Sequence, residues 1–87
     1  MSFAHPRTDW SVLSALLRLA QREGWTPVFG NGRVRLVHRR VAEGVVVLPA
    51  ALLTHARQTG WRVARRPQGF ELRHLAVRHR VELRLIA

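Results

Sequence analysis

Eighty-seven residues suffice for one small domain, whose core is thin because such a chain hides only roughly 60–65% of its unfolded surface. A hydrophobic content of 47% excludes a disordered chain, and the absence of cysteine excludes a disulfide framework and a thiolate metal site. Fifteen arginines against five acids give a formal net charge of +10, which makes a polyanionic partner the natural expectation.

The positive charge is concentrated in the later part of the chain. Residues 1–32 hold three arginines and two acids, whereas residues 33–87 hold twelve arginines and three glutamates. No apolar run approaches the length of a membrane span, and the first residues lack the basic-then-apolar shape of a signal peptide. We therefore expect a cytoplasmic protein with no membrane partner.

One stretch occurs twice, 36 residues apart. Residues 15–25 (ALLRLAQREGW) align without a gap on residues 51–61 (ALLTHARQTGW), and the same alignment pairs His38 with His74. Ten identities fall between positions 15 and 45, where chance would give about two or three. We interpret the chain as an internal repeat.

The first half begins with a helix. Residues 1–8 form a loose arm, and Thr8 or Asp9 caps a helix that Gly24 ends. Its apolar positions follow helical spacing: Val12, Leu13, Leu16, Leu17 and Ala20. A strand over Trp25–Phe29 follows, and Pro27 favours either an edge position or a bulge there.

Two further strands are predicted in this half. Gly30-Asn31-Gly32 is typical of a type I′ hairpin turn. After it, Val34, Leu36 and His38 alternate with Arg33, Arg35 and Arg39, which predicts a strand with one apolar and one basic face. Glu43-Gly44 forms a turn, and the run Val45–Leu48 is apolar on both faces, as in a central or interface strand.

The second half repeats this order. Pro49 suits the first turn of a helix that buries Leu52, Leu53 and Ala56 and ends at Gly60. The strands that follow are Trp61–Arg66, a strand carrying Phe70, Leu72 and His74 after the turn at residues 67–69, and a final strand at about Arg78–Ile86, with Val81, Leu83 and Leu85 inside.

These elements predict a single α+β domain over residues 1–87. It consists of two tandem α-β-β-β half-repeats, at about residues 9–48 and 49–87, that share one core. Two helices pack on one face of an antiparallel sheet of up to six strands, because neither half could bury its apolar face alone.

Strand alternation collects arginines on the face opposite the helices. Guanidinium groups bind phosphates in pairs of hydrogen bonds, so this face predicts binding to the backbone of DNA or RNA. Few aromatic residues lie among these arginines, so we expect weak sequence preference without base stacking. The predicted nucleic-acid-binding residues are Arg33, Arg35, Arg39, Arg62, Arg66, Arg73, Arg78, Arg80 and Arg84, interrupted by Glu71 and Glu82.

Two other interpretations of the arginines stay open. They could simply solvate an exposed sheet face and prevent edge-to-edge pairing. They could also serve a protein-interaction module, in which Val45–Leu48 and the sheet edges form a homodimer or dock on an acidic protein partner.

No residue pattern indicates catalysis or a cofactor. His38 and His74 could form a metal-binding or proton-transfer pair, but hydrogen-bonded core histidines are the commoner case. Trp25 and Trp61 fit core anchors just past each helix end. No carboxylates are paired for acid–base chemistry, so we expect a protein that is not an enzyme and holds no metal.

Residues 13–60 resemble the HicA-type toxins, which are small basic mRNA interferases with a double-stranded-RNA-binding-like α-β-β-β-α fold. The resemblance rests on Leu16-Leu17, Gly24-Trp25, His38 and Val47-Leu48-Pro49. It implies that fold and affinity for RNA. The family's catalytic histidine follows the turn glycine in a Gly-Ser-His stretch; here Gly32 precedes Arg33-Val34 and Gly69 precedes Phe70-Glu71. A HicA-like ribonuclease is therefore the third interpretation, behind the two binding functions.

Overall fold

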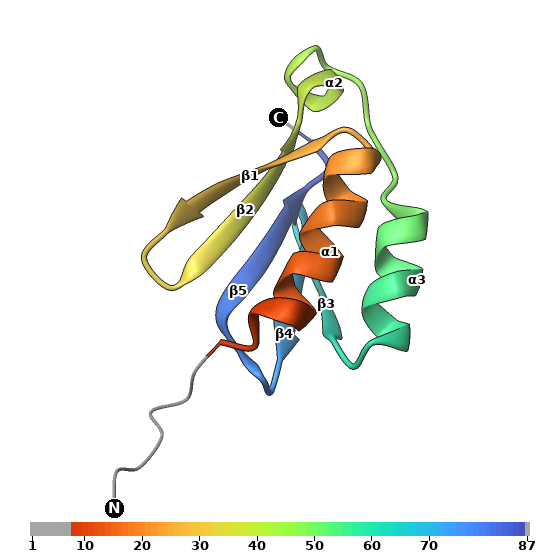
Figure 1. Cartoon of the computed structure of the whole chain (residues 1–87). Helices are drawn as coiled ribbons and strands as arrows, with labels where there is room; N and C mark the ends of the chain where they lie inside the picture. Colours follow the sequence, from red (N-terminus) through yellow and green to blue (C-terminus); the bar gives the residue numbers. More distant parts are fainter. Residues whose placement is uncertain (1–7, 87) are drawn as a thin grey trace, which may run out of the picture.

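A computed structural model of the chain describes residues 8–86 (Figure 1). The loose arm expected at residues 1–8 lies, except for Thr8, outside the described residues. The elements in chain order are α1 (Trp10–Arg22), β1 (Trp25–Gly30), β2 (Arg33–His38), α2 (Arg39–Ala42), α3 (Ala50–Gln58), β3 (Arg62–Arg66), β4 (Gly69–His74) and β5 (Val77–Arg84).

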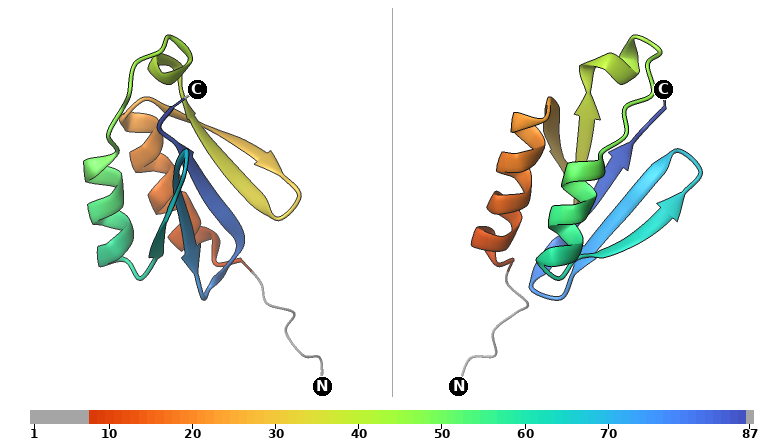
Figure 2. Two further views of the ribbon diagram at one scale, coloured as in Figure 1. Left: turned by 180° about the vertical axis from the view of Figure 1, so that it is seen from behind. Right: turned by 90° about the vertical axis from the view of Figure 1, so that its right-hand side faces the viewer.

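The molecule has two layers. The five strands form one sheet in the order β1-β2-β5-β4-β3. Helices α1 and α3 run antiparallel to each other over the same face of this sheet, and none of the helices in the described part of the chain covers the other face (Figures 1 and 2). The predicted α+β class, with helices on one sheet face, is confirmed.

Strand β5 is the centre of the sheet. It pairs in parallel with β2, where Val34 lies beside Val81, and antiparallel with β4, where Leu72 lies opposite Val81. The expected all-antiparallel sheet is therefore wrong, because the hairpins β1–β2 and β3–β4 flank β5 in opposite orientations.

The prediction of a strand at Val45–Leu48 is also wrong. These residues form an extended connection from α2 to α3 outside the sheet, with Val46 and Leu48 58% and 76% exposed. Only one position lies between the two hairpins, and β5 occupies it. The first half consequently ends in the short helix α2 instead of a third strand.

One continuous core joins both halves of the chain. Leu13, Leu16 and Ala20 of α1 and Leu52 and Ala56 of α3 pack against the alternating inward residues of the sheet. Those residues are Val34, Leu36, Leu72, Val81 and Leu83, which are at most 2% exposed. Trp25 and Trp61 are buried at its ends, as core anchors should be.

Asp9 fixes the beginning of α1. Its carboxylate accepts hydrogen bonds from the Ser11 hydroxyl, at 2.6 Å, and from the N–H groups of Ser11 and Val12. These bonds, led by that from the Ser11 hydroxyl, hold the pKa of Asp9 below its usual value. The ionised cap lies next to the positive end of the helix, which also favours its negative charge.

His38 ties the end of α1 to the hairpin β1–β2. Its Nδ1 accepts the Arg40 N–H at 3.1 Å, so the proton is on Nε2, which donates to the Glu23 carbonyl at 3.1 Å. The ring lies edge-on to Trp25. Gly24 has a φ of +94° and its missing side chain leaves room for His38, since a Cβ there would lie 2.6 Å from Nε2.

The second half contains the same set of contacts. His74 Nδ1 accepts the Ala76 N–H and its Nε2 donates to the Thr59 carbonyl, both at 2.9 Å. Trp61 lies against the ring, and Gly60 has a φ of +91°. Both histidines are thus hydrogen-bonded structural residues, as the commoner interpretation held.

The turn after β1 differs from the prediction. Of its two central residues, Asn31 and Gly32, only Gly32 has a positive φ, of +65°. All the other described residues with a positive φ are glycines elsewhere in the chain. A type I′ turn needs positive φ at both central residues, so Asn31 excludes it. The two-residue loop nevertheless pairs Gly30 with Arg33, and Pro27 lies on the edge strand, as expected.

Within residues 8–86, none of the helices combines the length and the apolar character that crossing a bilayer requires.

We predict that His38→Ala lowers the free energy of unfolding by about 2–4 kcal/mol, because it removes both hydrogen bonds of a buried ring and opens a cavity. His74→Ala should act in the same direction but less, since His74 is only half-buried. Urea unfolding measures both. Thr54→Ala, exposed on α3, is the control and should stay within about 0.5 kcal/mol; equal effects of His38→Ala and the control would contradict the structural role.

Candidate nucleic-acid interface

The side of the sheet without helices is basic, and we call it the arginine face. Alternation with buried neighbours places Arg33 and Arg35 there on β2, and Arg80 and Arg84 on β5. Arg73 of β4 alternates with buried Leu72, and Arg62 and Arg66 of β3 pair with Arg73 and Gly69. Alternation therefore places these seven of the nine predicted arginines on one face, and Arg78 joins them.

The other two arginines differ from each other. Arg78, at the beginning of β5, borders the same hollow as Arg62 and Arg73 and belongs to the arginine face. Arg39 does not continue β2, so its predicted place on this face is wrong. The chain leaves the sheet at His38, whose Nδ1 holds the Arg40 N–H, and Arg39 begins α2.

Like charges face each other across the strands. Arg33 lies beside Arg80 in the β2–β5 ladder, and Arg62 lies opposite Arg73 in the β3–β4 ladder. Such pairs destabilise a sheet, whereas opposite charges at the same positions would stabilise it. The arrangement is therefore unfavourable for folding by itself.

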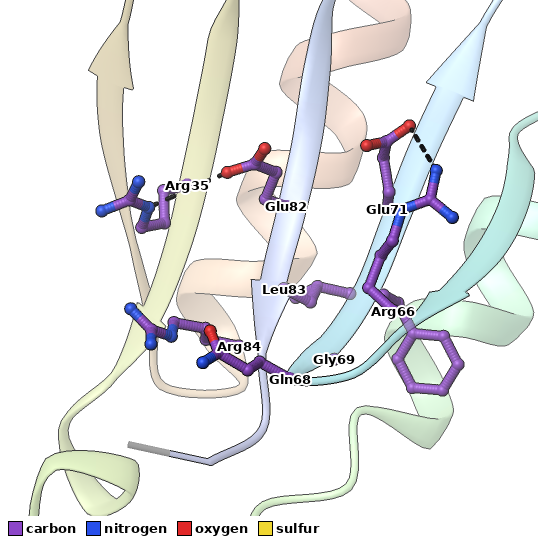
Figure 3. Close-up of a pocket in the computed structure, with 9 residues that line it drawn as sticks. Arg35, Arg66, Gln68, Gly69, Glu71, Glu82, Leu83 and Arg84 are labelled. Atoms are coloured by element: carbon purple, nitrogen blue, oxygen red, sulfur yellow. Dashed lines mark hydrogen bonds and ion pairs between the residues drawn. The ribbon is translucent and has the colours of Figure 1, made fainter.

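The middle of the face holds its two carboxylates (Figure 3). Glu71 and Glu82 lie directly opposite each other on β4 and β5. Arg66 and Arg73 lie 3.4 Å and 3.7 Å from Glu71, and Arg35 lies 3.9 Å from Glu82. The arginine side chains of these pairs are 40%, 55% and 60% exposed, so solvent weakens the pairs and another anion can take the place of the carboxylate.

A shallow hollow of about 240 Å³ surrounds these carboxylates. Arg35, Arg66 and Arg84 border it, and Gly69 forms part of its lining. A Cβ on Gly69 would meet the Leu83 carbonyl oxygen of the neighbouring strand, so only glycine permits this close approach of β4 and β5. The Nε of Arg84 is buried here and has no hydrogen-bond partner among residues 8–86.

A second hollow, which we call the end hollow, lies where β4 turns into β5. It measures about 400 Å³ and is lined by Arg62, Arg73 and Arg78 together with His74 and His79. No carboxylate belongs to its described lining. Arg62 and Arg78 of this hollow make no ion pair among the described residues, whereas Arg73 also lies near Glu71.

Neither histidine of the repeated pair offers a free ring nitrogen, because backbone groups occupy both nitrogens of His38 and of His74. In the described part of the chain, no three His, Cys, Asp or Glu side chains lie close enough together to hold a metal ion.

An aromatic cluster beside the end hollow was missed by sequence reasoning. Trp10 and Phe29 are 57% and 54% exposed, and both rings lie against His79, with centroids 5.6 Å and 6.3 Å away. The three residues come from α1, β1 and β5, so no spacing in the sequence connects them. The single available signal was an aromatic residue in the first turn of a helix whose apolar stripe begins at Val12.

No protein-family model matches the chain, and neither a curated protein nor a solved structure matches it.

We predict that Arg62→Glu raises the free energy of unfolding by about 0.2–1 kcal/mol, because it replaces the Arg62–Arg73 repulsion with an attraction. Thermal unfolding at low ionic strength measures the gain, which should shrink as salt is added. Arg65→Glu is the matched control: it lies on the same strand with the same charge change but pairs with Phe70. An equal gain in both variants would mean that net charge alone is responsible.

Proposed function

We propose that the arginine face binds the phosphate backbone of nucleic acid, without catalysis and with weak sequence preference. The observation that carries the proposal is the alignment of Arg33 with Arg80 and of Arg62 with Arg73. These pairs cost stability in the free protein, and phosphates placed between them would reverse the sign of that interaction.

The alternative of a merely solvated face accounts less well for this register. Solubility is served by interspersed charges of both signs, which also stabilise cross-strand pairs. The arginine face has two glutamates, and their ion pairs reach only Arg35, Arg66 and Arg73 among the described residues. Arg33, Arg80, Arg62 and Arg78 make no ion pair among the described residues and remain free to meet phosphates.

The resemblance to HicA-type toxins favours RNA as one ligand of this face. We do not extend the proposal to RNA cleavage, because backbone groups hold both ring nitrogens of His38 and of His74.

Binding should fall steeply with salt. If about six arginines each neutralise one phosphate, the plot of log affinity against log salt has a slope of about −4 on a single strand. Fluorescence anisotropy with labelled DNA and RNA of different sequences, at several salt concentrations, measures this slope. Absence of binding to every such ligand at low salt would contradict the proposal.

The double variant Arg33→Ala/Arg80→Ala should weaken binding to all sequences alike and reduce the slope by about 1 to 2. Arg18→Ala/Arg57→Ala is the matched control, since it removes the same charge from α1 and α3 on the other side of the sheet. Its slope should stay unchanged. Equal weakening by both double variants would show that overall charge, not the arginine face, attracts the ligand.

A second function is protein docking, either between copies of this chain or on an acidic partner. The exposed apolar connection Val45–Leu48 favours it, because runs of exposed valine and leucine mark interaction sites. Light scattering of the purified protein, and capture from cell extract with and without nuclease, separate the two functions. Capture that survives nuclease and is lost in Val46→Ser/Leu48→Ser would support docking.

A further inference from the structure

The exposed tryptophan is the feature that the proposed function leaves unexplained. Trp25 and Trp61 are 2% and 4% exposed, whereas Trp10 is 57% exposed on the first turn of α1. Phe29, at the end of the edge strand β1, is exposed to a similar extent. Large aromatic side chains left in water beside a basic surface are typical of sites that stack on nucleobases.

The aromatic cluster of Trp10, Phe29 and His79 is held in place by its surroundings. The Thr8 hydroxyl accepts the Arg78 N–H at 3.1 Å and lies 3.2 Å from His79 Nδ1. The Asp9 N–H donates to the Ala76 carbonyl at 2.6 Å, which joins the beginning of α1 to the beginning of β5. The platform is therefore organised before any ligand arrives, which lowers the entropic cost of binding.

His79 connects this cluster to the end hollow. Its ring lies 5.6 Å from that of Trp10, at 50° to it, and the same residue lines the hollow beside Arg62, Arg73 and Arg78. The cluster and the end hollow thus share His79, whose ring lies on the helix side of β5 while the neighbouring Arg78 lies on the arginine face, so the two meet around the end of the sheet. The carboxylate of Asp9, the residue before Trp10, is engaged by the Ser11 hydroxyl and by backbone N–H groups.

This combination fits one ligand chemistry. A phosphate in the end hollow would meet three guanidinium groups, and a base attached to the same strand would reach the open face of Trp10. A base inside a duplex has no free face to offer, whereas an unpaired base does. An acidic peptide would satisfy the arginines but would leave the rings in water.

We propose that the end hollow and the Trp10–Phe29–His79 cluster form a subsite for an unpaired nucleotide, so that the protein prefers single-stranded nucleic acid to duplex. The inference rests on the proposed function and specifies its ligand. The arginines supply affinity for any nucleic-acid strand, and the aromatic cluster supplies the preference for unpaired over paired bases.

Intrinsic tryptophan fluorescence tests the subsite, because Trp10 is the exposed indole and the other two are buried. An oligothymidylate should quench the emission, whereas a duplex of equal phosphate number and an abasic strand of the same length should not. Trp10→Phe should abolish the quenching while keeping a ring for stacking. Quenching that persists in Trp10→Phe, or that polyglutamate produces equally, would overturn the inference.

Affinity gives an independent test. Trp10→Ala should weaken oligothymidylate binding about 5- to 150-fold, the range expected for one lost base–aromatic stack. Its affinity for the duplex and for the abasic strand should stay within about twofold. Leu48→Ala, which removes an exposed apolar side chain from the α2–α3 connection, is the control and should change none of these affinities. The buried emission of Trp25 and Trp61 reports whether each variant is folded.

The outcomes separate the two proposals. If single strand, abasic strand and duplex bind equally well and Trp10→Ala changes nothing, the subsite is wrong and the phosphate-binding face stands. If none of the three ligands binds, the proposed function is wrong as well.

Discussion

Strand β5 is the constraint on which the rest of the molecule depends. It is the single strand between two hairpins, and it joins them through a parallel ladder on one side and an antiparallel ladder on the other. Its alternation turns Val81 and Leu83 toward α1 and α3 and leaves Arg80 and Arg84 on the opposite side. Residues that pair across two neighbouring strands lie on the same face of the sheet. The orientation of β5 therefore also determines the face on which the basic residues of β2 and β4 lie.

Local patterns in the sequence predicted most of the fold, because their causes are local. The i, i+3, i+7 spacing of Leu13, Leu16 and Ala20 and the stop at Gly24 determine α1, and alternation in residues 33–38 determines β2. The run Val45–Leu48 has an equally good strand pattern and forms none. Whether such a run joins a sheet depends on a free position between strands, which is a property of the whole fold.

The candidate site was predictable to the same extent. The alternation of side chains along a strand was enough to predict that the arginines of β2, β3, β4 and β5 lie on one face. It failed at Arg39, where the bond from the Arg40 N–H to His38 turns the chain out of the sheet. It could not reveal the cluster of Trp10, Phe29 and His79, because three elements remote in sequence meet there only after folding.

The core lies entirely between the helices and the inner side of the sheet, and this separation has a consequence for how the protein can change. Side chains on the uncovered side contribute nothing to interior packing, so their identity can drift without endangering the native state. Gly69 is the exception, since the backbone of β5 passes too close for any other residue. Evolution or protein design could therefore change the ligand that this small domain binds by substituting residues of the uncovered face, while the fold stays the same.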